Sequence, residues 1–353
     1  MKPFTYLGLP ARVIFGAGSL ARLPAELDLL GAKRALLLST PEQSDAVRRV
    51  AASLGARAAG VYDRAAMHVP VEIAEDARRV ARELDADIGI TVGGGSTTGL
   101  GKAIALTSGL PILAVPTTYA GSEMTPIYGL TEGGAKKTGR DARVLPKTVI
   151  YDPELTLSLP AARSASSGMN AIAHCVEALY AQDANPVISL MAEEGIRALG
   201  AALPAVIANP ADLEARGLAL YGAWLSGMAL GSAGMALHHK LCHTLGGTWN
   251  LPHAETHSIV LPHAARYNRD AAPEAMARIA RALGARDAPQ ALYDLEAGLG
   301  LKMKLADIGM PADGLERAAR IASAAPYPNP RPVEYGAILA LLRDAFDGRR
   351  PAA

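Results

Sequence analysis

The first 150 residues alternate between short apolar runs and longer stretches in which apolar residues recur at helical spacing. The apolar runs have the length of buried β-strands, and they lie at 34–39, 59–62, 87–93, 111–116 and 148–151. The stretches Glu42–Leu54 and Val71–Leu84 place their apolar residues on one helix face. This alternation predicts a parallel, Rossmann-like sheet with helices on both faces.

After Pro160 the pattern changes to a helical periodicity that continues to about Asp347. Ala, Leu, Met and Arg dominate this half, and runs of β-branched residues nearly vanish. The sequence therefore predicts an α/β domain at 1–155 and an all-α domain at 160–353, joined by a linker that contains two prolines. A chain of 353 residues is long enough for two domains of ordinary size.

One stretch, Leu218–Leu237, holds twenty residues without a charge, which is the length of a membrane-spanning helix. It also contains four glycines and two serines. Small residues let neighbouring helices approach closely, so we expect a buried central helix here rather than a membrane span.

Charge and cysteine content exclude some classes of protein. Lys plus Arg is 35 and Asp plus Glu is 34, and this balance argues against a nucleic-acid partner, which usually requires a basic excess. The two cysteines, Cys175 and Cys242, cannot form a disulfide framework, which favours a reducing, cytoplasmic compartment. The start of the sequence lacks the apolar core of a secretory signal.

Three glycine-rich or hydroxyl-rich segments compete as phosphate sites. The first, Gly16–Ala21, has the form G-x-G-x-x-A, but Ser39–Pro41 stand where a dinucleotide fingerprint needs an acidic residue. We interpret it as a strand-to-helix turn. The third, Pro116–Thr125, follows a strand and carries several hydroxyls, although an ordinary loop would have the same composition.

The second segment, Gly93–Lys102, follows the strongest strand and opens a helix. Three consecutive glycines let the backbone approach a pyrophosphate, and the helix N-terminus offers N–H groups to it. A P-loop would need Gly at 96 and Ser or Thr at 103, so Ser96 and Ala103 argue against a kinase or ATPase. A purely structural turn is the alternative. With the third segment at the end of the next strand, one nucleotide crevice is expected.

Seven of the eight histidines lie between 174 and 263. Asn170 and His174 are four residues apart, as are His239 and His243, so each pair shares a helix face. With His253 they make the layout of a metal site, with Asn170, His174, His239 and His253 as ligands and His243 nearby as a proton donor.

The amide of Asn170 is a poor ligand for Fe²⁺ or Zn²⁺, since imidazoles are normally joined by a carboxylate or thiolate, or else hold zinc as a set of three. We expect structural or surface roles for the other histidines of this region: His238, His257 and His263. Cys242 is next to a histidine in sequence, so on a helix the two side chains point apart and a nucleophilic cysteine is not expected.

These motifs together resemble the iron-containing alcohol dehydrogenase superfamily, whose fold is dehydroquinate-synthase-like. The matching segments agree in order and spacing over nearly the whole chain: FGAGSL at 15–20, GGGSTTGLGKAIAL at 93–106, PTTYAGSEMTP at 116–126, GMNAIAHCVEAL at 168–179 and HHKLCHTLGGTWNLPHAETHSIVLPH at 238–263. The resemblance implies an NAD(P)H-dependent oxidoreductase, a nucleotide-binding first domain, a catalytic second domain and a homodimer.

The resemblance also implies roles for individual residues. The cofactor would contact Gly93, Gly94, Gly95, Ser96, Thr97, Thr117, Thr118 and Ser122. The family's metal ligands fall on Asn170, His174, His239 and His253, and His243 matches the histidine beside the reacting centre. Thr40 follows the second strand in place of an acidic residue that would repel a 2′-phosphate, so NADH or NADPH is expected.

Within the superfamily the sequence is most similar to the branch that reduces maleylacetate to 3-oxoadipate in aromatic-compound catabolism. The pointers are HKLCHTLGG, PHAETH, and Asn170 where metal-dependent members carry Asp. The expected catalytic residues are His243, His253, His239 and His174, with no metal. The alternatives are a metal-dependent (Fe or Zn) alcohol dehydrogenase of the same superfamily and a non-catalytic nucleotide-binding protein.

A small dicarboxylate substrate would need cationic partners. Five basic residues lie within twelve positions with one acid between them: Lys136, Lys137, Arg140, Arg143 and Lys147. They are candidates for carboxylate binding. The alternative is a solvated basic hairpin.

Overall fold

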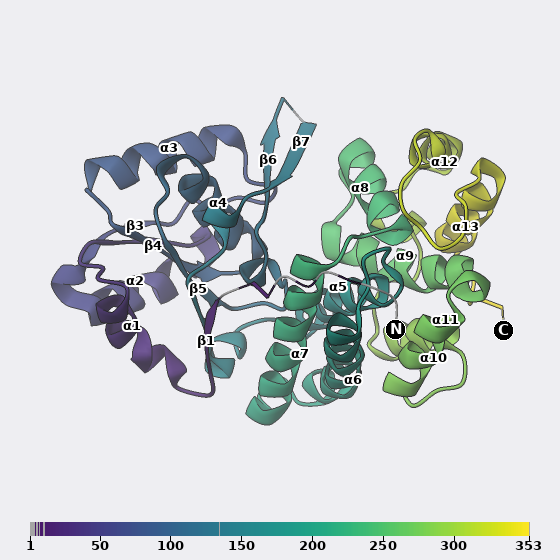
Figure 1. The fold of residues 1–353 in the computed structure, drawn as a ribbon, viewed down its shortest axis with the longest axis horizontal. Helices are drawn as coiled ribbons and strands as arrows, with labels where there is room; N and C mark the ends of the chain where they lie inside the picture. Colours follow the sequence, from purple (N-terminus) through teal and green to yellow (C-terminus); the bar gives the residue numbers. More distant parts are fainter. Residues whose placement is uncertain (1–3, 5, 7, 10, 134, 353) are drawn as a thin grey trace. The chain divides into compact units, whose positions relative to one another are not determined.

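The computed structural model describes residues 4, 6, 8, 9, 11–133 and 135–352, and it divides into two compact units (Figure 1). The α/β unit runs from Gly8 to Leu159, and the helical unit comprises the described residues from Pro160 onward together with Phe4 and Tyr6. A six-stranded parallel sheet in the order β1-β8-β5-β4-β2-β3 forms the α/β unit. Its strands are β1 (Arg12–Phe15), β2 (Ala35–Leu38), β3 (Ala58–Tyr62), β4 (Ile88–Gly93), β5 (Ile112–Pro116) and β8 (Thr148–Tyr151). All five predicted strands are present.

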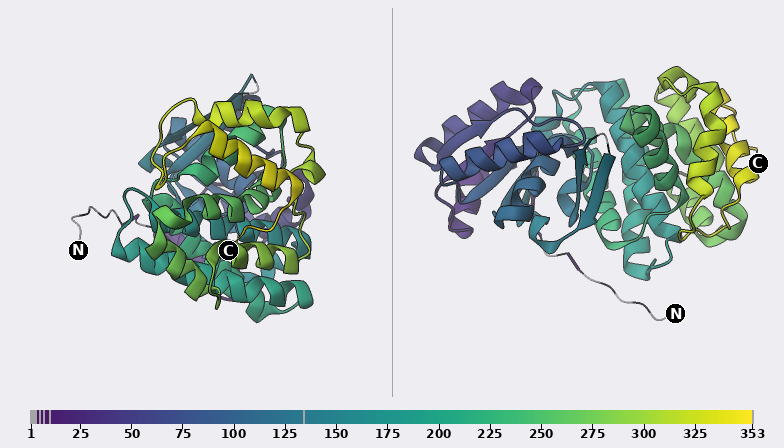
Figure 2. Two further views of the ribbon diagram at one scale, coloured as in Figure 1. Left: turned by 90° about the vertical axis from the view of Figure 1, so that its right-hand side faces the viewer. Right: turned by 90° about the horizontal axis from the view of Figure 1, so that it is seen from above.

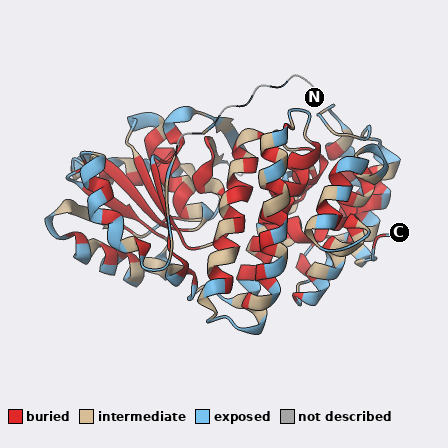
Figure 3. Ribbon diagram, turned by 60° about the horizontal axis from the view of Figure 1, so that its bottom comes forward, coloured by how far each residue is buried: buried red, intermediate tan, exposed pale blue. Residues whose placement is uncertain are grey.

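Helices cover both faces of this sheet because its strands are apolar on both sides. In β2, Leu37 packs with α1 and α2, whereas Leu36 and Leu38 pack with α3 and α4 on the opposite face. Figure 3 shows the strands as buried ribbons between partly exposed helices. The helices are α1 (Leu23–Leu29), α2 (Ser44–Leu54), α3 (Val71–Glu83) and α4 (Gly95–Ser108). The prediction of a doubly covered parallel sheet is confirmed.

The sheet order brings the two predicted nucleotide loops to one edge. β4 and β5 are parallel neighbours whose last residues, Gly93 and Pro116, are paired in register. β2 is the neighbour of β4 on the side away from β5, and β3 is the edge strand next to β2. From β2 the chain first adds β3 on one side and then β4 on the other, so the strand order reverses at this point. Such a reversal is where α/β sheets bind their ligands.

The basic run forms part of an antiparallel hairpin, β6 (Ile127–Glu132) with β7 (Ala135–Arg140). Lys137 pairs with Glu132, and Arg143 pairs with Asp141 at 2.7 Å, all four on exposed or half-exposed side chains. The Lys136 side chain lies outside the described residues. These ion pairs match the alternative of a solvated basic hairpin better than a carboxylate-binding site.

The second unit is helical throughout its described elements, which confirms the second part of the fold prediction. Its long helices α5, α6 and α7 pack side by side (Figures 1 and 2). The helices are α5 (Ala161–Tyr180), α6 (Pro186–Ala208), α7 (Leu213–Ser232), α8 (Leu237–Trp249), α9 (His253–Asn268), α10 (Pro273–Ala282), α11 (Ala288–Gly298), α12 (Leu315–Ser323) and α13 (Tyr335–Asp347).

The uncharged stretch at 218–237 is two helices rather than the single helix we expected. α7 ends at Ser232, and α8 begins at Leu237 after a turn in which Gly234 N–H donates to Asp183 at 2.8 Å. The glycines serve close packing, because a Cβ at Gly222 would lie 2.7 Å from Leu199 of α6. Across the described residues, every helix is too short or too polar to cross a bilayer.

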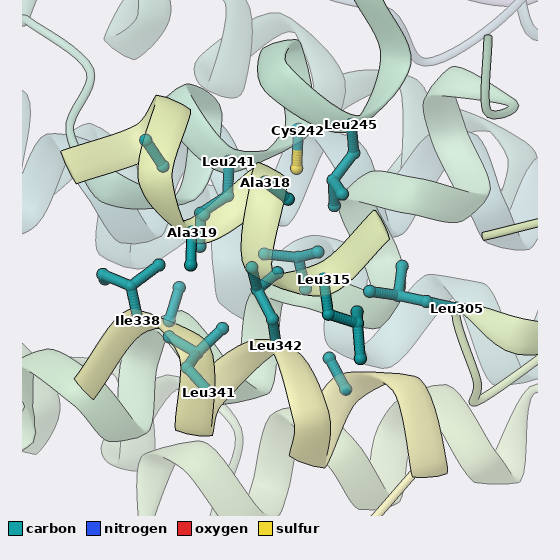
Figure 4. Packing of buried hydrophobic residues seen from close by; sticks show 14 of the residues in the cluster. Leu241, Cys242, Leu245, Leu305, Leu315, Ala318, Ala319, Ile338, Leu341 and Leu342 are labelled. Carbon is teal, nitrogen blue, oxygen red and sulfur yellow. The ribbon is translucent and has the colours of Figure 1, made fainter. Parts of the chain in front are cut away.

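A large apolar cluster holds α8 against α9, α12 and α13 (Figure 4). Leu241 and Leu245 of α8 point into it, as does the sulfur of Cys242. Burial raises the pKa of the Cys242 thiol well above its usual value, which keeps it protonated and unreactive. One side of α8 is therefore fixed by the core, and its other side carries histidines.

Candidate functional site

The first glycine-rich turn is closed by an internal carboxylate. Asp152 accepts hydrogen bonds from Gly18 N–H at 3.1 Å and from Leu20 N–H at 3.0 Å. These are the N–H groups that a phosphate would need at this turn. The Asp152 carboxylate therefore takes the place of an anion here, in agreement with the interpretation of Gly16–Ala21 as a structural turn.

The second segment has the geometry of a phosphate cradle. Gly93 has φ +156°, and a Cβ on it would lie 2.4 Å from Thr97 Oγ1. A Cβ on Gly94 would lie 2.9 Å from Thr118, so the two loops touch where glycine permits it. Gly94 is also the N-cap of α4 and supplies no side-chain acceptor, so the first-turn N–H groups of α4 can receive an anion.

The third segment is tied to the second at its start. Thr117 N–H donates to Gly93 O at 3.1 Å, and Thr117 Oγ1 accepts from Gln43 Nε2 at 2.7 Å. Gln43 ends the 3₁₀ turn Pro41–Gln43 that follows β2, with Thr40 as its N-cap. Sequence reasoning missed Gln43. Its place just beyond the strand at the reversal point was the available signal.

Lys102 does not face the phosphate cradle, although it belongs to the same sequence motif. Its side chain is completely buried, and Nζ donates to oxygens of Ser122, Thr125 and Ile127. Burial lowers the pKa of Lys102 to about 7, and the nearby carboxylate of Glu123 opposes that shift. The motif lysine is thus an internal anchor for the loop that follows β5.

The predicted catalytic histidines gather in the helical unit from three helices. α5 supplies Asn170 and His174, α8 supplies His239 and His243, and α9 supplies His253. The ring centroids of His174 and His239 are 5.2 Å apart, and those of His239 and His243 are 6.1 Å apart. His253 contacts the group through the ring of His257, whose centroid lies 4.1 Å from that of His253. The structure therefore brings together the residues that the spacing singled out.

Two further histidines complete this cluster and were predicted only as structural or surface residues. The His257 ring lies 4.9 Å from His239 and 4.1 Å from His253, and the His238 ring lies 5.0 Å from His239. Ring nitrogens of His238, His239 and His257 lie within 4.8 Å of one another. The four-residue spacing of His253 and His257 was the missed signal. His263 is buried, and burial lowers its pKa to about 4.

Glu177 of α5 orients the histidine cluster by accepting hydrogen bonds from α8. Its carboxylate is fully buried and accepts from His239 Nδ1 at 2.7 Å. It also accepts from the backbone N–H groups of Ala236 at 2.9 Å and His238 at 2.8 Å. These N–H groups belong to the first turn of α8, so one side chain caps the helix and orients a histidine on it. Burial raises the pKa of Glu177, while His238 and these N–H groups oppose the shift.

The hydrogen bond to Glu177 sets the tautomer of His239. Burial lowers the pKa of His239 well below its usual value, with His243 and His253 adding to the effect, so the ring is neutral. Its proton then lies on Nδ1, facing Glu177, and Nε2 carries a lone pair. His174 is likewise held neutral, chiefly by burial, and its Nδ1 lies 3.2 Å from Ser226 Oγ.

Some residues of this site are buried and others are exposed. Asn170, His174 and His239 are buried and are called the floor, whereas His243 and His253 are exposed and are called the mouth. Only the last two histidines can therefore exchange protons readily with solvent. This difference suits a site in which the floor holds a reactant and the mouth supplies a proton.

The floor could accept a divalent cation. His239 Nε2 and Asn170 Oδ1 are buried atoms with no hydrogen-bond partner in the part of the chain that the structure describes. Both are acceptors, and a carboxylate stands behind His239 as it commonly does behind metal-bound histidines. None of the four predicted ligands is an anion, so any cation would be held by neutral donors alone.

Comparison with known proteins gives consistent matches over the whole chain. The iron-containing alcohol dehydrogenase model matches residues 10–153, and the C-terminal model of the same family matches residues 164–346. A maleylacetate reductase from Burkholderia cepacia is 63% identical over 352 residues, with all of each chain covered. One from Sphingobium indicum is 59% identical, with 99% of each chain covered.

A solved structure adds to this similarity. The crystal structure of maleylacetate reductase from Agrobacterium tumefaciens superposes with a TM-score of 0.97 at 53% sequence identity. The alignment covers 99% of this chain and 100% of that one.

The role of Glu177 predicts a large loss of stability in Glu177→Ala. The change leaves buried N–H donors of α8 and His239 unpaired, and removing one partner of such a buried group costs about 3–5 kcal/mol. Urea unfolding followed by tryptophan fluorescence measures it, since Trp224 and Trp249 both lie in the helical unit. The control is Glu194→Ala, which breaks the surface pair with Arg197 and should cost less than about 1 kcal/mol. Equal losses in the two variants would contradict the role given to Glu177.

Proposed function

The chain belongs to the iron-containing alcohol dehydrogenase family, and we propose that it reduces the conjugated C=C bond of maleylacetate with NADH or NADPH to give 3-oxoadipate. The observation that carries the proposal is the full-length similarity to proteins named maleylacetate reductase. The buried, neutral rings of His174 and His239, with Asn170 one turn before His174 on α5, support it. The reaction would serve the breakdown of aromatic compounds.

The chemistry requires one hydride and one proton. The nicotinamide delivers hydride to the alkene carbon β to the ketone, and the C=C electron pair moves to make an enolate. The carbon next to the ketone then takes a proton, which restores the ketone and completes 3-oxoadipate, while NAD(P)H becomes NAD(P)⁺. The protein must therefore orient the nicotinamide, stabilise the enolate oxygen and supply the proton.

We assign the proton to His243 because it is the predicted catalytic residue on α8 that is exposed, next to the buried ring of His239. An exposed imidazole can be reprotonated from solvent after each turnover. His174 and His239 form the polar floor beneath the substrate, and His253 closes the mouth beside His243. These four residues remain the proposed catalytic set.

The reduced nucleotide is proposed to bind the strand-end loops of the α/β unit. The contacts would come from the cradle of Gly93, Gly94, Gly95, Ser96 and Thr97 and from Thr117, Thr118 and Ser122 of the loop after β5. Free N–H groups at the start of α4 suit the pyrophosphate. On this assignment residues 1–155 form the nucleotide domain and residues 160–353 the catalytic domain. A cytoplasmic homodimer is part of the proposal.

A divalent cation, if bound, would be held by His174, His239 and His253 with Asn170 as a neutral fourth donor. It would polarise the ketone oxygen. We propose that turnover does not depend on it, because the donor set lacks an anion and because the product keeps its ketone. In an alcohol dehydrogenase, by contrast, the alcohol oxygen itself must lose a proton, for which a metal is valuable.

The first prediction from this proposal concerns substrate and metal. Loss of NADH or NADPH absorbance with maleylacetate should be fast and should survive prolonged chelation, in protein that contains no stoichiometric metal by elemental analysis. Oxidation of simple alcohols with NAD⁺ is the assay for the metal-dependent alternative and should be negligible. Activity that disappears on chelation and returns with Fe²⁺ or Zn²⁺ would contradict the proposal that turnover is independent of metal.

The second prediction concerns the proton donor. His243→Gln should lower kcat by about 100-fold, because positioned general acids contribute on this order, while NADH affinity stays near that of the parent protein. The matched control is His263→Gln, a change to a buried histidine of the same unit that is not part of the cluster; its kcat should stay near the parent value. An unchanged kcat in His243→Gln would remove this residue from the mechanism.

A further inference from the structure

We propose that Lys102 is a positioning residue for the reduced nucleotide: it holds the loop after β5 in the shape that receives the cofactor without touching the cofactor itself. The inference rests on the proposed function and deepens it, because it names what gives the nucleotide site its geometry. The loop concerned is 117–127, which follows β5 and leads into β6.

The hydrogen bonds of Lys102 all go to the far end of this loop. Nζ donates to Ser122 O at 2.6 Å, to Thr125 O at 2.8 Å, to Thr125 Oγ1 at 2.9 Å and to Ile127 O at 2.7 Å. An ammonium group has three hydrogens, so these four oxygens use all of its donor capacity. The side chain is also 0% exposed, which leaves no path by which a phosphate could reach it.

The near end of the loop is held separately. Thr117 N–H donates to Gly93 O, and Gln43 donates to Thr117 Oγ1. Between the two anchors Gly121 adopts φ +76°, a left-handed turn that favours glycine, and Thr118 lies against Gly94. Two of the loop's proposed cofactor contacts, Thr117 and Ser122, are anchored residues, and the third, Thr118, lies between them. Their path is therefore fixed at both ends before any cofactor binds.

The position of Lys102 on α4 explains why the anchor matters for the nucleotide. Lys102 lies seven residues after Gly95, so the two share a face of the helix about two turns apart. The first turn of α4 offers its N–H groups to the pyrophosphate, and the third turn holds the second loop. One rigid helix thus fixes the distance between both halves of the cradle.

A hydrogen bond between Glu123 of the loop and Tyr151 of β8 completes the buried network. The Glu123 carboxylate is buried and accepts from Tyr151 Oη at 2.8 Å, and its charge favours the charged form of Lys102. Burying an ammonium group is costly compared with filling the same space with an apolar side chain. Because Lys102 donates to four oxygens of the loop, we assign it the role of fixing the geometry of that loop.

The test measures NADH binding directly, by fluorescence titration without substrate, together with steady-state kinetics. Lys102→Met keeps the length of the side chain and removes all four hydrogen bonds. Its Kd and KM for NADH should rise at least about tenfold, because ordering the loop must then be achieved by the cofactor. At saturating NADH, kcat should stay within about threefold of the parent and the KM for maleylacetate within about twofold.

Thr125 supplies a milder second variant if Lys102→Met folds poorly. Thr125→Val removes one acceptor and should raise the Kd for NADH severalfold, and Thr125→Ser should restore the parent value. The matched control is Glu26→Gln, which weakens the ion pair between the buried Glu26 of α1 and the half-exposed Arg12 of the edge strand β1. It should lower the melting temperature while leaving NADH affinity unchanged.

The outcomes separate this inference from the proposed function. A parent-like Kd for NADH in folded Lys102→Met and Thr125→Val, or an equal rise in Glu26→Gln, would overturn the positioning role. Parent protein that binds NADH but does not reduce maleylacetate would overturn the proposed reaction, while a raised Kd in Lys102→Met would still uphold the role of Lys102.

Discussion

The histidine cluster depends on one buried carboxylate. Glu177 accepts the N–H groups at the start of α8 and the Nδ1–H of His239 together, so the helix and its histidine are placed by the same atoms. Capping alone could be done by a serine or threonine at the helix end. A carboxylate from α5 also ties two helices together, and it leaves His239 Nε2 as a lone pair at the floor of the cluster.

The α/β unit uses the reverse arrangement. There a buried cation, Lys102, gathers carbonyl and hydroxyl oxygens of one loop, whereas Glu177 gathers N–H groups of one helix start. In each unit a fully buried charge satisfies backbone groups that would otherwise be costly to bury. Both charges lie behind the surfaces proposed to contact the reactants. Among the described residues His239 Nε2 has no hydrogen-bond partner, so it stays available as an acceptor.

Much of the fold was predictable because its signals are local. Apolar runs such as 87–93 can be read as strands, and the four-residue spacing of His239 and His243 places both on one helix face. The partners of these residues are not local: Glu177 lies 62 residues from His239, and Gln43 lies 74 from Thr117. Lys102 shows the limit most clearly. It belongs to the segment predicted to bind phosphate, but only tertiary packing shows that its side chain bonds to Ser122 and Thr125 instead.

The tautomer of His239 tests the account most directly, because it decides whether Nε2 presents a lone pair or a proton. Nitrogen-15 NMR of histidine-labelled protein at pH 7 distinguishes the three protonation forms of an imidazole, and loss of one signal set in His239→Gln assigns it. The account predicts a neutral ring with its proton on Nδ1, shifted toward the other tautomer in Glu177→Gln. A proton on Nε2, or a doubly protonated ring, in the parent protein would contradict it.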